Sequence, residues 1–207
     1  MSINFIPPKT VEVPDIQFKR RIDLHADKTA LIVIDMQNDF VKEGGSLVVP
    51  SASDTIPKIQ RQLQKARDAG VQIIYTQDTQ IPGDPEFDVW PEHCLKDSWG
   101  WEIIEELSPQ EGDLVCPKNR YDGFYGTWME HFLTRIWKLE NVFITGTVSN
   151  ICVLHTAASA GLRWLHVVAA ADGMSALTDF EQALTLHQIA TLYGGEVATS
   201  VDHIHFT

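Results

Sequence analysis

Thr29-Ala-Leu-Ile-Val-Ile-Asp35 is a short, unbroken apolar run that is partly β-branched and ends in a carboxylate. Such a run predicts a strand that is buried on both faces, because a parallel sheet is covered by helices on each side. Five more runs of similar composition predict further strands, at residues 71–76, 113–117, 141–146, 166–171 and 196–199.

Helical patterns fill the intervals between these runs. Apolar residues recur at helical spacing in residues 55–69, 127–138 and 180–193, and residues 150–162 are rich in Ala. Strands that alternate with helices predict an α/β fold whose parallel sheet carries helices on both faces. Ligands of such sheets bind at the carboxyl ends of the strands, so the functional residues are expected there.

Length and composition limit the remaining possibilities. The 207 residues suit one α/β domain at residues 29–207, preceded at residues 1–28 by an extended N-terminal arm in which prolines interrupt any helix. The formal net charge of −12 argues against nucleic-acid and membrane partners, which need basic patches. Three cysteines without a repeating spacing, and no apolar leader or membrane span, predict a cytoplasmic protein with reduced thiols.

Three reactive residues follow three of the predicted strands. Asp35 ends the first strand, Lys118 follows the third, and Cys152 follows the fourth near the start of a helix. Taken singly, each has a commoner structural explanation, as a turn cap, a surface charge and a small core residue. A parallel sheet brings the three together, however, and a helix start is expected to lower the pKa of a thiol. An acid, a base and a thiol at one site predict nucleophilic acyl transfer.

Three segments around these residues resemble those of the isochorismatase-like cysteine hydrolases, the family that includes the nicotinamidases. Ala30-Leu-Ile-Val-Ile-Asp-Met-Gln-Asn-Asp-Phe40 resembles the opening strand with its catalytic Asp. Lys118-Asn-Arg-Tyr-Asp-Gly-Phe-Tyr-Gly-Thr127 resembles the lysine loop, and Gly146-Thr-Val-Ser-Asn-Ile-Cys-Val153 resembles the nucleophile loop. The order and spacing of the segments agree over about residues 29–200, with Ser149 where the family usually has Thr.

The resemblance implies a six-stranded, mostly parallel, Rossmann-like sheet in a three-layer α/β/α sandwich. It implies a catalytic triad of Asp35, Lys118 and Cys152. It also implies a cis peptide bond between Thr147 and Val148, and an oxyanion hole formed by the N–H groups of Val148 and Cys152. Relatives are commonly dimers or tetramers, so the resemblance further implies a homo-oligomer.

The expected activity is hydrolysis of a C–N bond in a small, planar, nicotinamidase-like amide, through a thioester on Cys152. Members of the family that hydrolyse vinyl ethers resemble this chain less well, because they lack the nucleophilic Cys. Hydrolysis of a ureido or carbamoyl amide is an alternative, with ureidoacrylate, biuret, N-carbamoyl and maleamate types as candidates. A non-catalytic binding member of the fold is a second alternative.

A metal site is implied only in part. Trp90-Pro-Glu-His-Cys94 resembles the metal-binding histidine block of nicotinamidases, and Asp78 is also in place, but Gln80 stands where those enzymes have a second His. Since imidazole binds zinc better than an amide oxygen does, we expect no required cofactor. The alternative is a divalent zinc, iron or manganese ion held by Asp78 and His93.

The substrate pocket is expected to be aromatic. Trp90, Phe124 and Tyr125 are candidates for its walls, together with Trp99, although core packing is a commoner role for such side chains. Arg120 and Tyr121 follow Lys118 closely and are candidates for binding a substrate carboxylate; a surface position is the alternative for Arg120.

Overall fold

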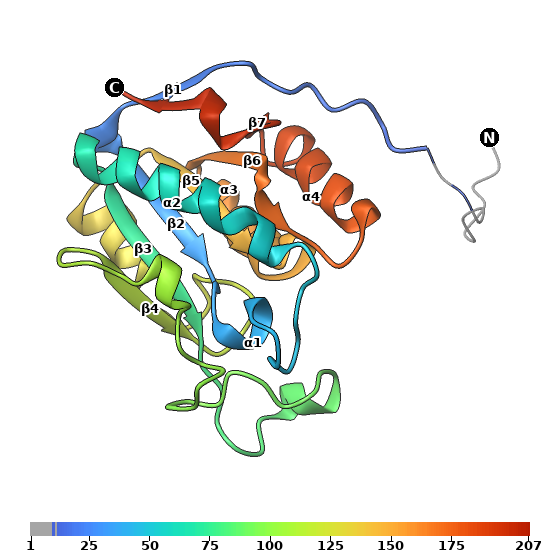
Figure 1. Ribbon diagram of the computed structural model, residues 1–207. Coiled ribbons are helices and arrows are strands. Elements are labelled where there is room, and N and C mark those ends of the chain that lie inside the picture. Colours follow the sequence, from blue (N-terminus) through green and yellow to red (C-terminus); the bar gives the residue numbers. More distant parts are fainter. Residues whose placement is uncertain (1–9, 11) are drawn as a thin grey trace.

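The computed structural model describes residue 10 and residues 12–207, and its centre is a six-stranded parallel sheet (Figure 1). The strand order is β4-β3-β2-β5-β6-β7, so the predicted α/β class and the parallel sheet are confirmed. The strands are β2 (Thr29–Ile34), β3 (Gln72–Asp78), β4 (Leu114–Lys118), β5 (Asn141–Thr147), β6 (His166–Ser175) and β7 (Glu196–Ala198).

Two apolar clusters cover the two faces of this sheet. Leu31 and Val33 of β2 belong to one cluster, while Ile32 and Ile34 belong to the other, as the alternation of side chains along a strand requires. The first cluster includes residues of α1 (Asn38–Val41) and α2 (Ala52–Ala69). The second includes residues of η4 (His131–Ile136), η5 (Ser149–Val153), α3 (Leu154–Leu162) and α4 (Asp179–Thr191). The three-layer sandwich is thus confirmed.

The helices differ from the predicted ranges mainly at their ends. The second half of the predicted helix at residues 127–138 forms η4, whose turns are wider than those of an α-helix. The helix after β5 begins with a similar wide turn, η5, and continues directly into α3. Short single turns lie in the connections, namely η1 (Ala26–Lys28), η2 (Pro85–Asp88), η3 (Glu105–Leu107) and η6 (Val201–His203).

The strand order reverses between β2 and β5, and this position sets where the site forms. Chain connections leave the sheet in opposite directions at such a reversal, which opens a crevice at the carboxyl ends of the two strands. Gly146 of β5 is the register partner of Ile34 of β2. A Cβ atom at Gly146, whose φ is +116°, would lie 2.2 Å from the Ile34 carbonyl oxygen. Only glycine therefore lets the two strand ends approach this closely.

The predicted N-terminal arm is partly built into the fold. Residues 1–9 and 11 of the arm lie outside the described residues. Its last part differs from an extended arm, because β1 (Ile22–Leu24) pairs in parallel with β8 (Ile204–Phe206) near the C-terminus. Lys19 forms a bridge to Ala198 at the β7 edge of the main sheet, and Figure 1 shows the segment before it leading away from the body.

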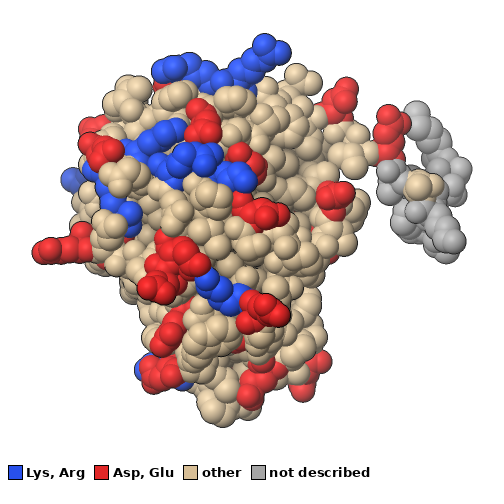
Figure 2. Space-filling model, in the orientation of Figure 1, with Lys and Arg blue, Asp and Glu red and all other residues tan. Residues whose placement is uncertain are grey.

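Charges on the surface are mixed. Figure 2 shows Lys and Arg gathered on one face together with Asp and Glu. Among these surface charges, Arg61 and Lys65 of α2 both pair with Asp202, at 3.1 and 3.3 Å. Among the described residues, no helix is both long and apolar enough to cross a bilayer.

Candidate active site

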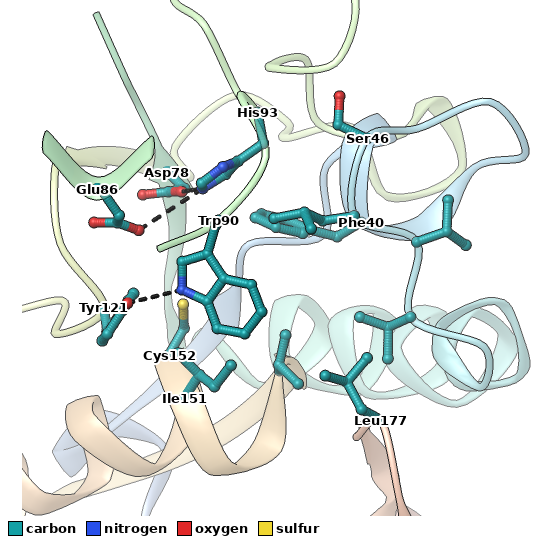
Figure 3. A pocket seen from close by; sticks show the side chains of 14 residues that line it. Phe40, Ser46, Asp78, Glu86, Trp90, His93, Tyr121, Ile151, Cys152 and Leu177 are labelled. Atoms are coloured by element: carbon teal, nitrogen blue, oxygen red, sulfur yellow. Dashed lines mark hydrogen bonds and ion pairs between the residues drawn. The ribbon is translucent and has the colours of Figure 1, made fainter. Parts of the chain in front are cut away.

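A pocket of about 280 Å³ opens at the carboxyl ends of the strands, next to the reversal of strand order (Figure 3). Cys152 lies at its floor, and Asp78, Glu86 and His93 lie at one end. The remaining wall is largely apolar and includes Phe40, Leu47, Val48, Val49, Ile151 and Leu177.

The structure brings the three reactive residues together below this pocket. The Lys118 Nζ atom lies 2.7 Å from Asp35 Oδ2 and 3.6 Å from Cys152 Sγ. The side chains of Lys118 and Asp35 are completely buried, and only Cys152 reaches the pocket surface. The ends of β2, β4 and β5 therefore place a carboxylate, an ammonium and a thiol within contact distance of one another.

Hydrogen bonds fix the orientation of the Asp35 carboxylate. The Thr76 hydroxyl donates to Asp35 Oδ1 at 2.6 Å and accepts the Asp35 N–H at 3.1 Å. This leaves Oδ2 for Lys118. Asp35 also has a φ of +46°, a left-handed conformation that few side chains adopt, directly after β2. The sharp change of direction turns the carboxylate toward the neighbouring strand ends.

Burial dominates the electrostatics of the three groups. Burial raises the pKa of Asp35, although the Lys118 ammonium opposes this effect. Burial would lower the pKa of Lys118, but the Asp35 and Asp78 carboxylates outweigh it and hold that pKa well above its usual value. Burial also raises the pKa of Cys152. The expected lowering of this pKa at a helix start is therefore not what the structure shows, and the thiol needs a base to lose its proton.

The loop that precedes Cys152 contacts a side chain of α4. The peptide bond between Thr147 and Val148 is cis. The next residue, Ser149, donates a hydrogen bond from its hydroxyl to the Ser175 carbonyl at 2.9 Å and also contacts the Gln182 side-chain oxygen. Gln182 itself was not predicted from the sequence, since it lies about 30 residues beyond the loop in the chain, on the exposed start of a helix pattern.

A second cluster lies at the polar end of the pocket. Asp78 Oδ2 is 3.2 Å and Glu86 Oε1 is 3.8 Å from His93 Nε2, as the dashed lines of Figure 3 indicate. Potential ligand atoms of the three residues lie within 4.8 Å of one another. Glu86 joins the two residues that the sequence indicated; it lies on η2, where nothing in the local sequence marks it as a ligand.

The geometry of this cluster fits a divalent metal ion. His93 Nδ1 lies 2.7 Å from the Pro91 carbonyl, so Nε2 faces the two carboxylates, which is how metal-binding histidines are commonly oriented. Gln80 donates to Asp78 Oδ1 at 3.2 Å, and its own Oε1 atom is buried without a hydrogen-bond partner in the described part of the chain. Two carboxylates and one imidazole suit zinc, iron or manganese.

The cluster is also balanced without an ion. Burial opposes charge on Asp78, but Lys118 and His93 outweigh it and lower the pKa of Asp78. Burial likewise opposes charge on His93, but the hydrogen bonds with Asp78 and the Pro91 carbonyl, together with the charges of Asp78 and Glu86, outweigh it and raise the pKa of His93. Burial and the Asp78 carboxylate raise the pKa of Glu86.

Two of the predicted aromatic residues reach the pocket. Trp90 and Tyr121 both line it, and the indole N–H of Trp90 donates to the Tyr121 hydroxyl at 2.9 Å (Figure 3). The apolar wall from residues 47–49 and Leu177 was not predicted, because these residues lie in connections without a periodic pattern.

The other predicted pocket residues lie elsewhere. Arg120 pairs with Asp84 at 3.2 Å and does not line the pocket. Phe124 is buried in the core with the Arg163 guanidinium 4.7 Å from its ring centre. Tyr125 is 68% exposed, so none of these three side chains lines the pocket. Trp99 is also largely exposed, beside a different hollow of the surface.

Comparison with known proteins identifies relatives for nearly the whole domain. The family model described as the isochorismatase domain matches residues 29–202. The ureidoacrylate amidohydrolase RutB of Stutzerimonas stutzeri is 31% identical over 198 residues, covering 83% of this chain and 79% of that protein.

Solved structures agree with these sequence matches. The N-carbamoylsarcosine amidase of Thermoplasma acidophilum is 33% identical with a TM-score of 0.77, covering 84% of this chain and 97% of the other. The pyrazinamidase of Pyrococcus horikoshii, solved in complex with zinc, is 27% identical with a TM-score of 0.77, covering 83% and 98%. The chain therefore belongs to the isochorismatase-like cysteine hydrolase family.

Proposed function

We propose that the protein is a cysteine-dependent amidase that cleaves the C–N bond of a small amide through a thioester on Cys152. The observation that carries this proposal is the position of the Lys118 ammonium, 2.7 Å from the Asp35 carboxylate and 3.6 Å from the Cys152 thiol. The three groups lie buried under a pocket large enough for a small molecule. Amidases among the relatives support the same reaction class.

The first half of the reaction forms the thioester. Asp35 accepts the Cys152 proton while Lys118 stabilises the negative charges that remain. The sulfur attacks the amide carbonyl, and the N–H groups of Val148 and Cys152 bind the oxyanion of the tetrahedral intermediate. The protonated Asp35 then gives its proton to the leaving nitrogen, so that the C–N bond breaks as ammonia or an amine departs.

The second half returns the enzyme to its starting state. A water molecule gives its proton to Asp35 and attacks the thioester carbonyl. The C–S bond breaks, the acid product leaves, and Cys152 regains a proton from Asp35. Every proton that the carboxylate removes is thus given back within one turnover. The three side chains therefore account for the nucleophile and for all the proton transfers.

A divalent metal is not required by these steps. If one binds, we propose Asp78, Glu86 and His93 as its ligands, with the unpartnered Gln80 oxygen beside them. A metal there would supply a Lewis-acidic point that orients a substrate atom at the polar end of the pocket. Metal analysis of protein purified without added metal tests this: stoichiometric zinc, iron or manganese would support the site, and Asp78→Ala should then remove the ion.

Two substrate classes follow from the relatives. The first is a planar amide of the nicotinamidase type, and the second is a ureido or carbamoyl amide, as the names of the ureidoacrylate amidohydrolase and the N-carbamoylsarcosine amidase suggest. An ammonia-release panel with nicotinamide, pyrazinamide, ureidoacrylate, biuret, maleamate and N-carbamoyl amino acids separates them. We also propose a cytoplasmic homo-oligomer, which light scattering after size exclusion would test.

The decisive test of the chemistry is Cys152→Ala with Cys116→Ala as its matched control. Both cysteines are buried, but Cys116 lies inside β4 and does not line the pocket. Cys152→Ala should abolish ammonia release, whereas Cys116→Ala should keep it. Rapid acid quenching of the wild type should reveal a protein mass increased by the acyl group. Retained activity in Cys152→Ala would refute the mechanism. A wild type that hydrolyses none of the amides in the panel would favour a binding protein.

A further inference from the structure

We infer that the pocket takes an amide whose acyl side is uncharged and apolar, and that it discriminates against amides that carry a carboxylate. This inference rests on the proposed function and narrows its substrate class. It separates acids such as ureidoacrylate, maleamate and N-carbamoyl amino acids from neutral aromatic amides such as nicotinamide and pyrazinamide.

The first support is the wall of the pocket. Apolar side chains from three segments of the chain line the space above Cys152: those between β2 and α2, between β5 and α3, and between β6 and α4 (Figure 3). Trp90 donates its indole N–H to the Tyr121 hydroxyl, which leaves the hydroxyl groups of Tyr121 and Ser46 as the side-chain donors of this wall. This wall therefore offers an apolar acyl group good contact and offers an anion few hydrogen-bond donors.

The second support is the position of the nearby cations. Among the described residues, no Lys or Arg side chain lines the pocket. Lys118 is fully buried and lies between the carboxylates of Asp35 and Asp78, at 2.7 and 3.4 Å. Arg120 does not line the pocket, and it pairs with Asp84 and Glu86 at 3.2 and 3.8 Å. Each of these two cations is thus already paired with two carboxylates of the protein.

The third support is the acidic end of the pocket. Asp78 and Glu86 present two carboxyl groups there, with His93 as the one basic group that lines the pocket in the described chain. Since Asp78 already engages His93 at 3.2 Å, a substrate carboxylate would lose its water here mainly in front of two carboxyl groups, which is unfavourable.

A pair of near-isosteric amides tests the inference. Succinamate and 4-oxopentanamide have the same chain length, and a methyl group of the second replaces a charged oxygen of the first. We expect the wild type to hydrolyse 4-oxopentanamide with a kcat/KM at least about 100-fold higher than that for succinamate. The two amides are compared in buffer with EDTA, so that no divalent ion at the polar end can bind the carboxylate of succinamate.

A variant with a new cation in the wall provides the complementary test. Val48 lines the pocket and is 41% exposed, so an arginine there can reach both the pocket and water. Val48→Arg should reduce the discrimination between the two amides at least about tenfold, since it gives the anion a partner. Val48→Met, of similar length but uncharged, should leave the discrimination as in the wild type.

The outcomes separate this inference from the proposed function. Hydrolysis that depends on Cys152 but favours succinamate, or treats the two amides equally, would overturn the inference and leave the amidase intact. Equal effects of Val48→Arg and Val48→Met would also count against it. Ammonia release that survives in Cys152→Ala would instead remove the proposed function, whatever the preference between the two amides.

Discussion

Replacing Lys118 by Met tests the arrangement of charges under the pocket most directly. The 2.7 Å separation of Lys118 Nζ and Asp35 Oδ2 corresponds to about 6 kcal/mol of attraction at an effective dielectric constant of about 20. Desolvation of both groups offsets much of this attraction. Removing one partner of a buried pair nevertheless leaves an uncompensated charge, which typically costs about 3–5 kcal/mol. We therefore expect Lys118→Met to lose that much unfolding free energy, together with its activity.

The loss should depend on pH in a defined direction. Burial raises the pKa of Asp35 and the Lys118 ammonium opposes it, so this pKa should rise further in Lys118→Met. A carboxyl group with a raised pKa binds its proton more tightly in the folded state. The unfolding free energy of the variant, relative to the wild type, should therefore recover as pH falls from about 8 toward about 4, the pKa of an unfolded Asp.

Urea unfolding of four proteins measures the effect. These are the wild type, Lys118→Met, Asp35→Asn and the double variant. Removing both charges leaves no unpaired partner in this pair, so the double variant should lose about 3 kcal/mol less than the sum of the single losses. Additive losses, or a loss below about 1 kcal/mol in Lys118→Met, would refute the reasoning.

Three further predictions concern other parts of the site. Gln182→Leu removes both the side-chain oxygen that contacts Ser149 in the loop before Cys152 and the hydrogen bond to the Ala171 carbonyl at 2.7 Å. Because this loop positions Cys152, steady-state kinetics should show kcat about tenfold lower with KM nearly unchanged. An unaltered kcat would contradict this expectation. Gly100→Ala places a Cβ atom 2.1 Å from Asp39 Oδ2, and urea unfolding should show a loss of about 1–3 kcal/mol. Burial raises the pKa of both Cys116 and Cys152, but only Cys152 lines the pocket, so iodoacetamide at pH 8 should label Cys152 faster than the fully buried Cys116, as peptide mass spectrometry can measure.

The sheet could be predicted because its strands are buried on both faces. β2 and β5 appear in the sequence as continuous apolar runs, which few other structures require. The sequence also predicts that three reactive residues lie together, because each stands at or after the carboxyl end of a strand, namely Asp35, Lys118 and Cys152. The topology then does what the sequence spacing alone cannot, since it brings residues 117 positions apart into one cluster.

The walls and the charges could not be predicted in the same way. Glu86 and Leu177 reach the pocket through connections whose paths depend on tertiary packing, so no local pattern marks them. Nearness to Lys118 in the sequence does not predict the pocket residues, because Tyr121 lines the pocket while Arg120 does not and pairs with Asp84 instead. The direction of the Cys152 pKa depends on burial, which a position at a helix start does not reveal.

The tight approach of Gly146 to Ile34 has a consequence for how new specificities arise. Because the two backbones touch, the nucleophile loop cannot shift without moving the strand that carries Asp35. The nucleophile loop and the end of β2 therefore form one rigid block. Val48 and Leu177 belong to partly exposed connections outside that block, so exchanging them leaves the block undisturbed. A lineage with this fold can thus acquire a different amide by remodelling the entrance while the chemistry beneath it stays as it was.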